Sequence, residues 1–318
     1  MKTIYIAFFP DFMFPLREAG RKVFIETIKN HPESISSEYT FYYLGTEELE
    51  VSKNITLLPI KNLKTDNSTV RYKIFTPNYD RRVHQFLTKK CKDDFTEIYF
   101  LDGNPFPRNR YIDHIIRKLL LLTCYRNTSI HCLTKFQCDC CFPFSTKIYP
   151  LPESLKNLKS QEFSFRPERR ILYMGPLLEC KGLLHILPAI RLLFERDQDV
   201  EFHICQSTNE TDQSVLDLMK NLEHEYPKRI VWKGVVDPLD ELNRAAVYLY
   251  PFNARTMAIP LSIVEAQNAG CHAIISDHHG NRDLFEYDPK IKILSEQQLN
   301  SPVYFSETIL SILNEIFR

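Results

Sequence analysis

The sequence predicts an α/β protein with two doubly wound sheets of parallel strands. Short apolar runs alternate with amphipathic helical spacing along nearly the whole chain. In residues 230–275, two apolar runs flank a helical segment, which is the strand–loop–helix–strand unit of a parallel sheet. Residues 150–167 are rich in Pro, Ser, Lys and Asn and are typical of a linker. The chain is therefore expected to form two such domains.

The elements of the first half follow from its apolar pattern. Apolar runs predict strands at residues 3–9, 39–44, 55–60, 95–101, 129–133 and 146–149. Helical spacing predicts helices at residues 17–29, 80–91 and 108–124, and residues 62–70 are polar and loop-like.

The second half of the chain also alternates between apolar runs and helical spacing. Strands are expected at residues 170–174, 200–205, 230–232, 247–250 and 273–275. Helices are expected at residues 183–195, 212–225, 261–269 and 306–317.

Composition indicates a globular protein with an ordinary core. The 318 residues are 44% hydrophobic and 25% charged, and the formal net charge is zero, so nucleic acid is not an expected partner. The N-terminal apolar run is too short for a secretory signal, and no apolar run reaches the roughly 20 residues that span a bilayer. We therefore expect a cytoplasmic protein whose nine cysteines are reduced.

Four of the cysteines are clustered without the spacing of a zinc site, namely Cys132, Cys138, Cys140 and Cys141. We interpret them as structural or incidental thiols.

Charge is distributed unevenly between the halves. Residues 1–165 carry 24 Lys and Arg against 18 Asp and Glu, and the remainder carries 16 against 22. A basic first half could attract anionic substrates or lipid headgroups, or it could be a solvated surface with no partner. The helix expected at residues 108–124 places Arg117 and Lys118 beside a run of leucines. Such a helix either lies peripherally on a membrane surface or packs against the sheet.

Ligands of parallel sheets bind beyond the carboxyl ends of the strands. Residues 251–260 lie at such an end and lead directly into a helix, whose free N–H groups favour a phosphate. Residues 265–275 of this unit read EAQNAGCHAII. They resemble the E-A-x-A-x-G-x-P-V-I element of the large family 4 of retaining, nucleotide-sugar-dependent glycosyltransferases. Asn268 and His272 depart from its second Ala and its Pro.

Two further elements carry the same resemblance. Residues 175–182, GPLLECKG, are similar to the family's G-R-x4-K-G loop, and residues 232–236, WKGVV, to its F-x-G-x-V element. The three elements occur in family order and cover most of residues 170–294. The resemblance implies the GT-B fold, in which two Rossmann-like domains face a cleft. It further implies an acceptor-side domain with linker at residues 1–165, a nucleotide-sugar domain at 166–305, and a terminal helix at 306–318 that crosses back to the first domain.

The donor site is expected in the second half. Lys181 follows the Gly175 turn, so its ammonium can face the diphosphate beside helix N–H donors; otherwise it is a solvated lysine. Glu265 matches the second Glu of the family's E-x7-E element, which implies hydrogen bonds to the ribose hydroxyls, unless it is a buried glutamate paired with a neighbour. Val235 and Leu261 are further donor-binding positions implied by the resemblance.

Two positions depart from the family at the donor site. Pro176 stands where the family has an arginine, and Arg255 is the candidate substitute cation, although it could instead pair with a surface acid. Met257 stands where the family has the first Glu of E-x7-E, and Thr256 and the backbone of Ala258 remain to contact a phosphate or sugar hydroxyl.

Asp102 is the candidate catalytic residue. The family often has a histidine after the strand that residues 95–101 resemble, and aligning the strand ends puts Asp102 there. An acid at this place could bind sugar hydroxyls or polarise the acceptor, or it could only cap the turn at Gly103. Retention in this family is explained by front-side attack, which requires no protein nucleophile. No D-x-D element lies in a suitable loop, in agreement with the metal independence that the resemblance implies.

The resemblance therefore implies a metal-independent, retaining hexosyltransferase without a cofactor. The donor would be a UDP or GDP sugar, and the acceptor a glycan, glycolipid or glycoprotein. A catalytically silent GT-B module that binds a partner or glycan is the main alternative, because both departures fall at donor positions. A nucleotide-sugar epimerase is a second alternative function.

Overall fold

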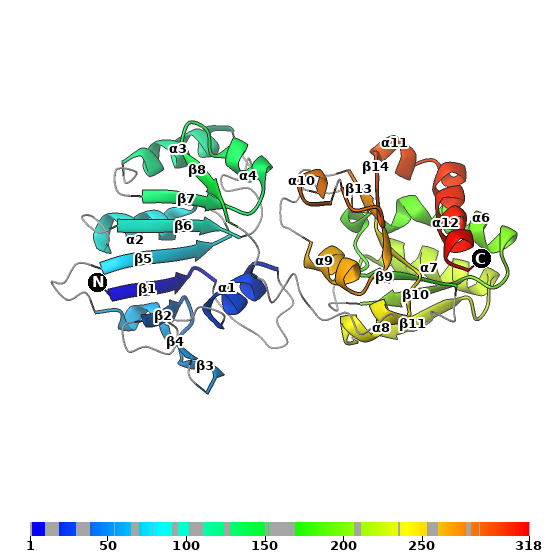
Figure 1. Cartoon of the computed structure of the whole chain (residues 1–318), viewed down its shortest axis with the longest axis horizontal. Coiled ribbons are helices and arrows are strands. Elements are labelled where there is room, and N and C mark those ends of the chain that lie inside the picture. The colour runs from blue at the N-terminus through cyan, green and yellow to red at the C-terminus, as the bar shows by residue number, and fades with distance from the viewer. Residues whose placement is uncertain are drawn as a thin grey trace. The chain divides into compact units, whose positions relative to one another are not determined.

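The structure is a computed structural model of the chain, and Figure 1 labels its elements. It describes residues 2–9, 19–29, 39–53, 55–64, 70–77, 79–90, 95–101, 111–123, 128–149, 152, 169–206, 211–234, 236–252, 260–277, 281–285 and 287–317. The described residues form two compact units, with unit 1 in residues 1–155 and unit 2 in residues 156–318. Each has its own sheet and its own hydrophobic core.

Unit 1 contains an eight-stranded sheet in the order β3-β4-β2-β1-β5-β6-β7-β8. Its neighbouring strands are parallel, except that β3 runs antiparallel to β4 at one edge. The strands are β1 (Lys2–Ala7), β2 (Tyr39–Tyr43), β3 (Leu49–Ser52), β4 (Ile55–Pro59), β5 (Val70–Thr76), β6 (Phe95–Phe100), β7 (Thr128–Cys132) and β8 (Thr146–Ile148).

Helices cover both faces of this sheet. On one face α2 (Arg81–Lys90), α3 (Tyr111–Leu122) and α4 (Lys135–Cys140) contribute to a core that includes Ile74 and Phe100 of the strands. On the other face α1 (Ala19–Lys29) packs through Phe24, whose ring centre lies 5.0 Å from that of Phe75. Side chains that alternate along β5 thus reach opposite layers, as the pleat of a strand requires.

Unit 2 contains a wholly parallel six-stranded sheet in the order β11-β10-β9-β12-β13-β14. Its strands are β9 (Arg170–Met174), β10 (Glu201–Cys205), β11 (Ile230–Gly234), β12 (Val247–Tyr250), β13 (His272–Ser276) and β14 (Ile291–Leu294). Parallel neighbours need crossover connections, and helices supply them here.

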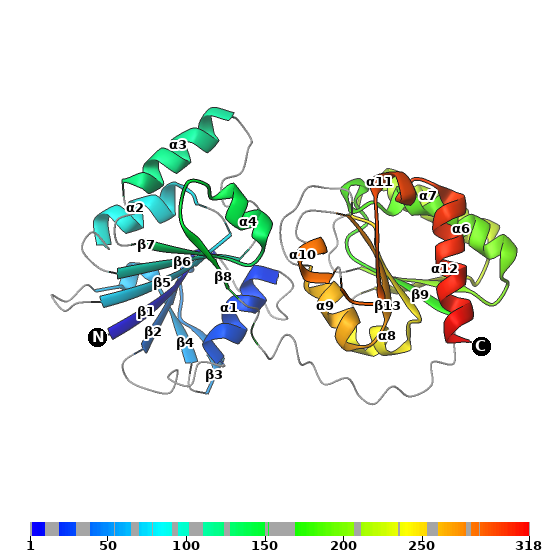
Figure 2. The ribbon, with the colours of Figure 1, turned by 45° about the horizontal axis from the view of Figure 1, so that its top comes forward.

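The helices of unit 2 form two layers around the sheet (Figure 2). One layer holds α6 (Leu183–Arg196), α7 (Gln213–Glu225) and the terminal α12 (Pro302–Ile316), which share a continuous apolar core. The other holds α8 (Pro238–Arg244) and α9 (Leu261–Asn268), and the short helices α10 (Asn281–Phe285) and α11 (Glu296–Leu299) flank β14. Because Phe305, Ile309 and Leu313 pack into this core, α12 is an integral part of unit 2. The crossing of the terminal helix to the first domain stays a prediction.

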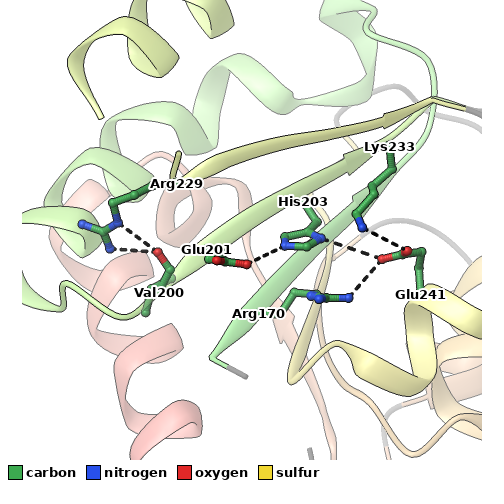
Figure 3. Close-up of polar contacts among 7 residues, drawn as sticks. All are labelled: Arg170, Val200, Glu201, His203, Arg229, Lys233 and Glu241. Carbon is green, nitrogen blue, oxygen red and sulfur yellow. Dashed lines mark hydrogen bonds and ion pairs between the residues drawn. The ribbon is translucent and has the colours of Figure 1, made fainter. Parts of the chain in front are cut away.

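Charged side chains fix α8 to the sheet (Figure 3). Glu241 of α8 accepts a hydrogen bond from Nη1 of Arg170 at 3.2 Å, and the Nζ of Lys233 lies 3.6 Å from its other oxygen. His203 lies between Glu241, at 3.8 Å, and Glu201, at 2.8 Å. The side chains of Arg170 and Glu241 are only 5% and 9% exposed, so their opposite charges compensate each other away from water.

The predicted architecture of two doubly wound α/β units is confirmed, and α6 and α7 match their predicted ranges to within one residue. Three strands, β3, β5 and β14, are absent from the predicted elements. Strand β5 lies beside β1 in the middle of its sheet, where an unbroken apolar run is the expected signal. Its apolar residues instead alternate with Arg71 and Lys73. A strand in the middle of the sheet can hold these cations because their side-chain nitrogens lie 2.8 and 3.7 Å from the carboxylate oxygens of the buried Glu97.

Helix α12 begins at Pro302, four residues before the start at residue 306 that the sequence predicts. The Ser301 hydroxyl caps it by accepting from the N–H of Tyr304, and proline is well suited to the first helical position. Within the described ranges, no helix has the length and apolar character needed to cross a membrane.

Candidate functional site

The connectivity of unit 2 defines one switch point. From β9 the chain continues through β10 to β11 on one side, then returns to place β12 on the other side of β9. The connections that leave β9 and β12 therefore diverge at the carboxyl edge of the sheet, where open α/β sheets bind ligands. The loops after β9 and β12 are the two segments that sequence analysis selects.

The loop after β9 is held by hydrogen bonds from three neighbouring segments. The Tyr173 hydroxyl donates to the carbonyl of Pro176 at 2.8 Å, and the N–H of Gly175 donates to the carbonyl of Cys205 at 3.0 Å. An Oδ of Asp212, the residue before α7, accepts from the N–H of Glu179 at 2.7 Å. These bonds fix the loop's path before any ligand binds, which lowers the ordering cost of binding.

Gly182 brings the two loops into contact. It adopts a left-handed conformation with φ of 73°, directly between the short 3-10 turn η3 (Glu179–Lys181) and α6. A Cβ atom built there would lie 1.7 Å from the carbonyl oxygen of Pro251, the residue after β12. Only glycine allows both this backbone conformation and this approach.

The contact also positions Lys181. Its Nζ lies 4.1 Å from the centre of the Phe252 ring, and Phe252 is itself buried. A cation over an aromatic face is held by the ring's quadrupole, which restricts where the ammonium can go. The same ammonium stands one residue before the N-cap of α6, so the positive end of that helix and the lysine charge are neighbours. An anion is the ligand that this arrangement favours.

Glu265 lies on α9, which begins after β12 and its loop, at the same edge of the sheet. It is 9% exposed, and Leu261 at the start of the helix is also buried. Burial raises the pKa of the neighbouring Tyr248 well above its ordinary value, and nearby phenols and the Glu265 carboxylate raise it further. A buried carboxylate near the mouth of a parallel sheet is suited to accepting hydrogen bonds from paired hydroxyls.

The structure thus describes four of the predicted site residues, Gly175, Lys181, Leu261 and Glu265, all around the carboxyl ends of β9 and β12. The other five, Asp102, Val235, Arg255, Thr256 and Ala258, lie outside the described residues. Among the residues that are described, no group of three or more His, Cys, Asp or Glu side chains lies together as a metal-binding set.

Two residues of this site are missing from the sequence predictions. Phe252 directly follows the Pro251 that ends the β12 run, and an aromatic residue there is a weak signal of a platform. Asp212 is an acidic residue before a helical pattern, which predicts a helix cap. It instead caps the N–H of Glu179 in the neighbouring loop, a long-range contact that no local pattern indicates.

Most of unit 2 matches a known family model. Residues 168–315 match the family model described as "Glycosyl transferases group 1". A search of curated proteins found no match.

Solved structures with a similar fold cover most of the chain. TarM from S. aureus, in complex with fondaparinux, alpha-GlcNAc-glycerol and UDP, is 14% identical with a TM-score of 0.58 over 77% of the chain. The match spans only 48% of TarM, about half its length. Anabaena Alr3699/HepE in complex with UDP is 9% identical, with a TM-score of 0.68 over 99% of this chain and 90% of its own. The sucrose-phosphate synthase of Thermosynechococcus elongatus is 11% identical, with a TM-score of 0.63 over 99% of this chain and 90% of its own.

Proposed function

We propose that the protein transfers a sugar from a nucleotide-diphosphate donor to a glycan-type acceptor. The match of residues 168–315 to the glycosyl transferases group 1 model supports this, and so does the doubly wound architecture that both units share with the GT-B fold. The observation that carries this proposal is the placement of Lys181 against Phe252 at the switch point of the sheet. The ammonium and the N-terminus of α6 would face the diphosphate, whose negative charge grows as the sugar leaves.

The nucleoside is assigned to the α9 side of the site. Glu265 would accept hydrogen bonds from both ribose hydroxyls, and Leu261 would line the start of this pocket. In the loop before α9, Arg255 would supply a second cation, and Thr256 and Ala258 would contact phosphate or sugar. Gly175 and Val235 complete the donor-binding set. The proposal favours UDP over GDP because the TarM and HepE complexes both contain UDP.

The acceptor side is assigned to residues 1–165 and the donor side to residues 166–305. Asp102 would bind the transferred sugar or polarise the acceptor. The reaction would proceed with retention, through front-side attack in which the leaving phosphate removes the acceptor proton, and without a metal. The acceptor would be a glycan, free or carried on a lipid or protein, and the enzyme would act in the cytoplasm.

Calorimetric titration of the full chain with UDP and with GDP tests the donor assignment. We expect heat of binding with UDP, weaker or no binding with GDP, and a clear loss of UDP affinity in Lys181→Ala. Absence of binding to both nucleotides would contradict the proposal.

A panel of UDP sugars with oligosaccharide acceptors separates the proposed activity from its alternatives. Transfer, or slow donor hydrolysis without acceptor, supports the enzyme. UDP binding with neither reaction supports a catalytically silent module, which the Pro176 and Met257 departures favour. A new epimer of the donor without acceptor indicates an epimerase.

A further inference from the structure

Helix α3 of unit 1 leaves its apolar side chains exposed. Among its described side chains, residues 115–122, only Leu121 is buried. Four large aliphatic side chains are 42–56% exposed, namely Ile115, Ile116, Leu119 and Leu122. A helix of a globular protein normally turns such residues to the core, so this helix has an apolar face that unit 1 does not cover.

A fifth apolar side chain lies next to this face. Phe142, in the turn between α4 and β8, is 75% exposed, and its carbonyl accepts a hydrogen bond from Lys118 of α3. Figure 2 shows α3 on the outside of unit 1, beyond α2. We call the five side chains Ile115, Ile116, Leu119, Leu122 and Phe142 the α3 patch.

Positive charge accompanies the α3 patch. Arg117 donates to the carbonyl of Tyr79 at 2.8 Å, and Lys118 to that of Phe142. These two bonds orient the side chains of Arg117 and Lys118. The described charged side chains of α2, α3 and α4 are six basic and one acidic: Arg81, Arg82, Lys89, Arg117, Lys118, Lys135 and Asp139. Asp80, just before α2, pairs with Arg82 at 2.6 Å.

We propose that the α3 patch docks unit 1 on a membrane surface that contains anionic lipids. Aliphatic and phenylalanine side chains on one face with Lys and Arg beside them are the composition of helices that lie in the plane of a bilayer. The excess of basic side chains on the three helices matches a negative surface. The proposal stands independently of the sugar transfer.

Flotation of the full chain with lipid vesicles tests this. We expect binding to vesicles of phosphatidylcholine with roughly a third phosphatidylglycerol, no binding to phosphatidylcholine alone, and release by about 0.5 M salt. The double variant Leu119→Ser, Leu122→Ser should reduce the vesicle-bound fraction at least about tenfold, because two half-exposed leucines no longer enter the bilayer.

Helix α7 of unit 2 offers matched controls. Leu218 is 48% exposed there, and Lys220 is exposed on the same helix. Leu218→Ser should leave vesicle binding unchanged. Lys118→Gln should weaken binding about fivefold, as one basic charge near an anionic surface does, and Lys220→Gln should have no effect.

Three outcomes would overturn the proposal. The first is equal binding to neutral and anionic vesicles. The second is equal loss of binding in the Leu218→Ser control. The third is the absence of binding to the anionic vesicles. If sedimentation then shows a dimer that the Leu119→Ser, Leu122→Ser variant dissociates, the patch binds a second copy of this chain. The four variants replace exposed side chains or, at Lys118, a half-buried one, and circular dichroism tests whether each is folded.

Discussion

The ammonium of Lys181 lies over the ring of Phe252, 4.1 Å from its centre, although 71 positions separate the two residues along the chain. Their contact depends on Gly182, which lets the loop after β9 approach the carbonyl of Pro251. A cation held beside a helix N-terminus at the switch point of a parallel sheet is the physical basis of the proposed donor site.

Lys181→Ala should weaken UDP binding by about 1–3 kcal/mol, because a charge-assisted hydrogen bond to the diphosphate is lost. Calorimetric titration measures this directly. Lys220→Ala, on the exposed surface of α7, is the control and should bind as the wild type does. Equal affinities for the wild type and Lys181→Ala would remove this lysine from the site.

Gly182→Ala should destabilise unit 2 more than Gly234→Ala. Both glycines have positive φ, 73° and 63°, so each alanine costs about 1–2 kcal/mol of backbone strain. A Cβ at Gly234 meets nothing within 4 Å, whereas one at Gly182 meets a backbone oxygen at 1.7 Å. We expect about 1–3 kcal/mol of additional loss at Gly182, measured by urea unfolding. Equal losses at both positions would show that the two loops do not need this approach.

Glu265→Gln should weaken UDP binding by about 1–3 kcal/mol if the carboxylate binds the ribose hydroxyls. A UDP analogue lacking both hydroxyls identifies the contact. The wild type should discriminate strongly against the analogue, and Glu265→Gln should discriminate much less. If the variant and the wild type discriminate equally, Glu265 does not contact the ribose.

Glu241→Gln should cost about 3 kcal/mol of unfolding free energy, because it removes the buried carboxylate that lies against Arg170 and Lys233. The exposed pair Arg191–Glu225, at 2.7 Å, provides the control. Glu225→Gln should cost no more than about 1 kcal/mol, since both side chains are more than 40% exposed. Chemical denaturation of both variants measures the difference, and similar losses would contradict the role given to the buried pair.

His203 should make unit 2 less stable in mild acid. Burial lowers its pKa, the positive charges of Arg170 and Lys233 act in the same direction, and the hydrogen bond to Glu201 only partly opposes them. Above the unfolded value of about 6.5 the imidazole is neutral in both states and pH has no effect through it. As the pH falls below that value, the unfolded chain binds a proton more readily than the folded one, so stability is lost until the folded pKa is passed.

The measurement is the unfolding free energy from neutral pH to about pH 5, compared between the wild type and His203→Gln. The wild type should lose more stability than the variant over this interval. Parallel pH profiles would show that His203 does not titrate differently in the two states.

Much of the fold can be predicted from the sequence, because the βα alternation gives each element a local signal. Helices α6 and α7 are predicted to within one residue for this reason. The central strand β5 is missing from the prediction although Arg71 and Lys73 alternate with apolar residues, a pattern typical of a half-buried strand. Its place in the middle of the sheet cannot be read from that pattern, because the partner of both cations, Glu97, lies on the next strand. Charge compensation between strands is a tertiary property.

The same distinction between local signals and tertiary contacts applies to the residues of the candidate site. Lys181 and Glu265 are identifiable from spacing and family resemblance, because each occupies a fixed place in a local element. The role of Phe252 depends on a loop contact across β9 and β12, and that of Asp212 on a hydrogen bond to Glu179. No pattern within one segment encodes a distance between two segments.

The strand order of unit 2 has a consequence for its synthesis. Among the strands of unit 2, β9 is translated first. One of its two neighbours in the sheet, β12, begins only at Val247. Until that segment has been translated, the innermost strand presents an unpaired edge, which is a template for association with other nascent chains. Expression of chains truncated before Val247 should therefore yield aggregates, whereas chains that extend through β14 and α12 should remain in solution.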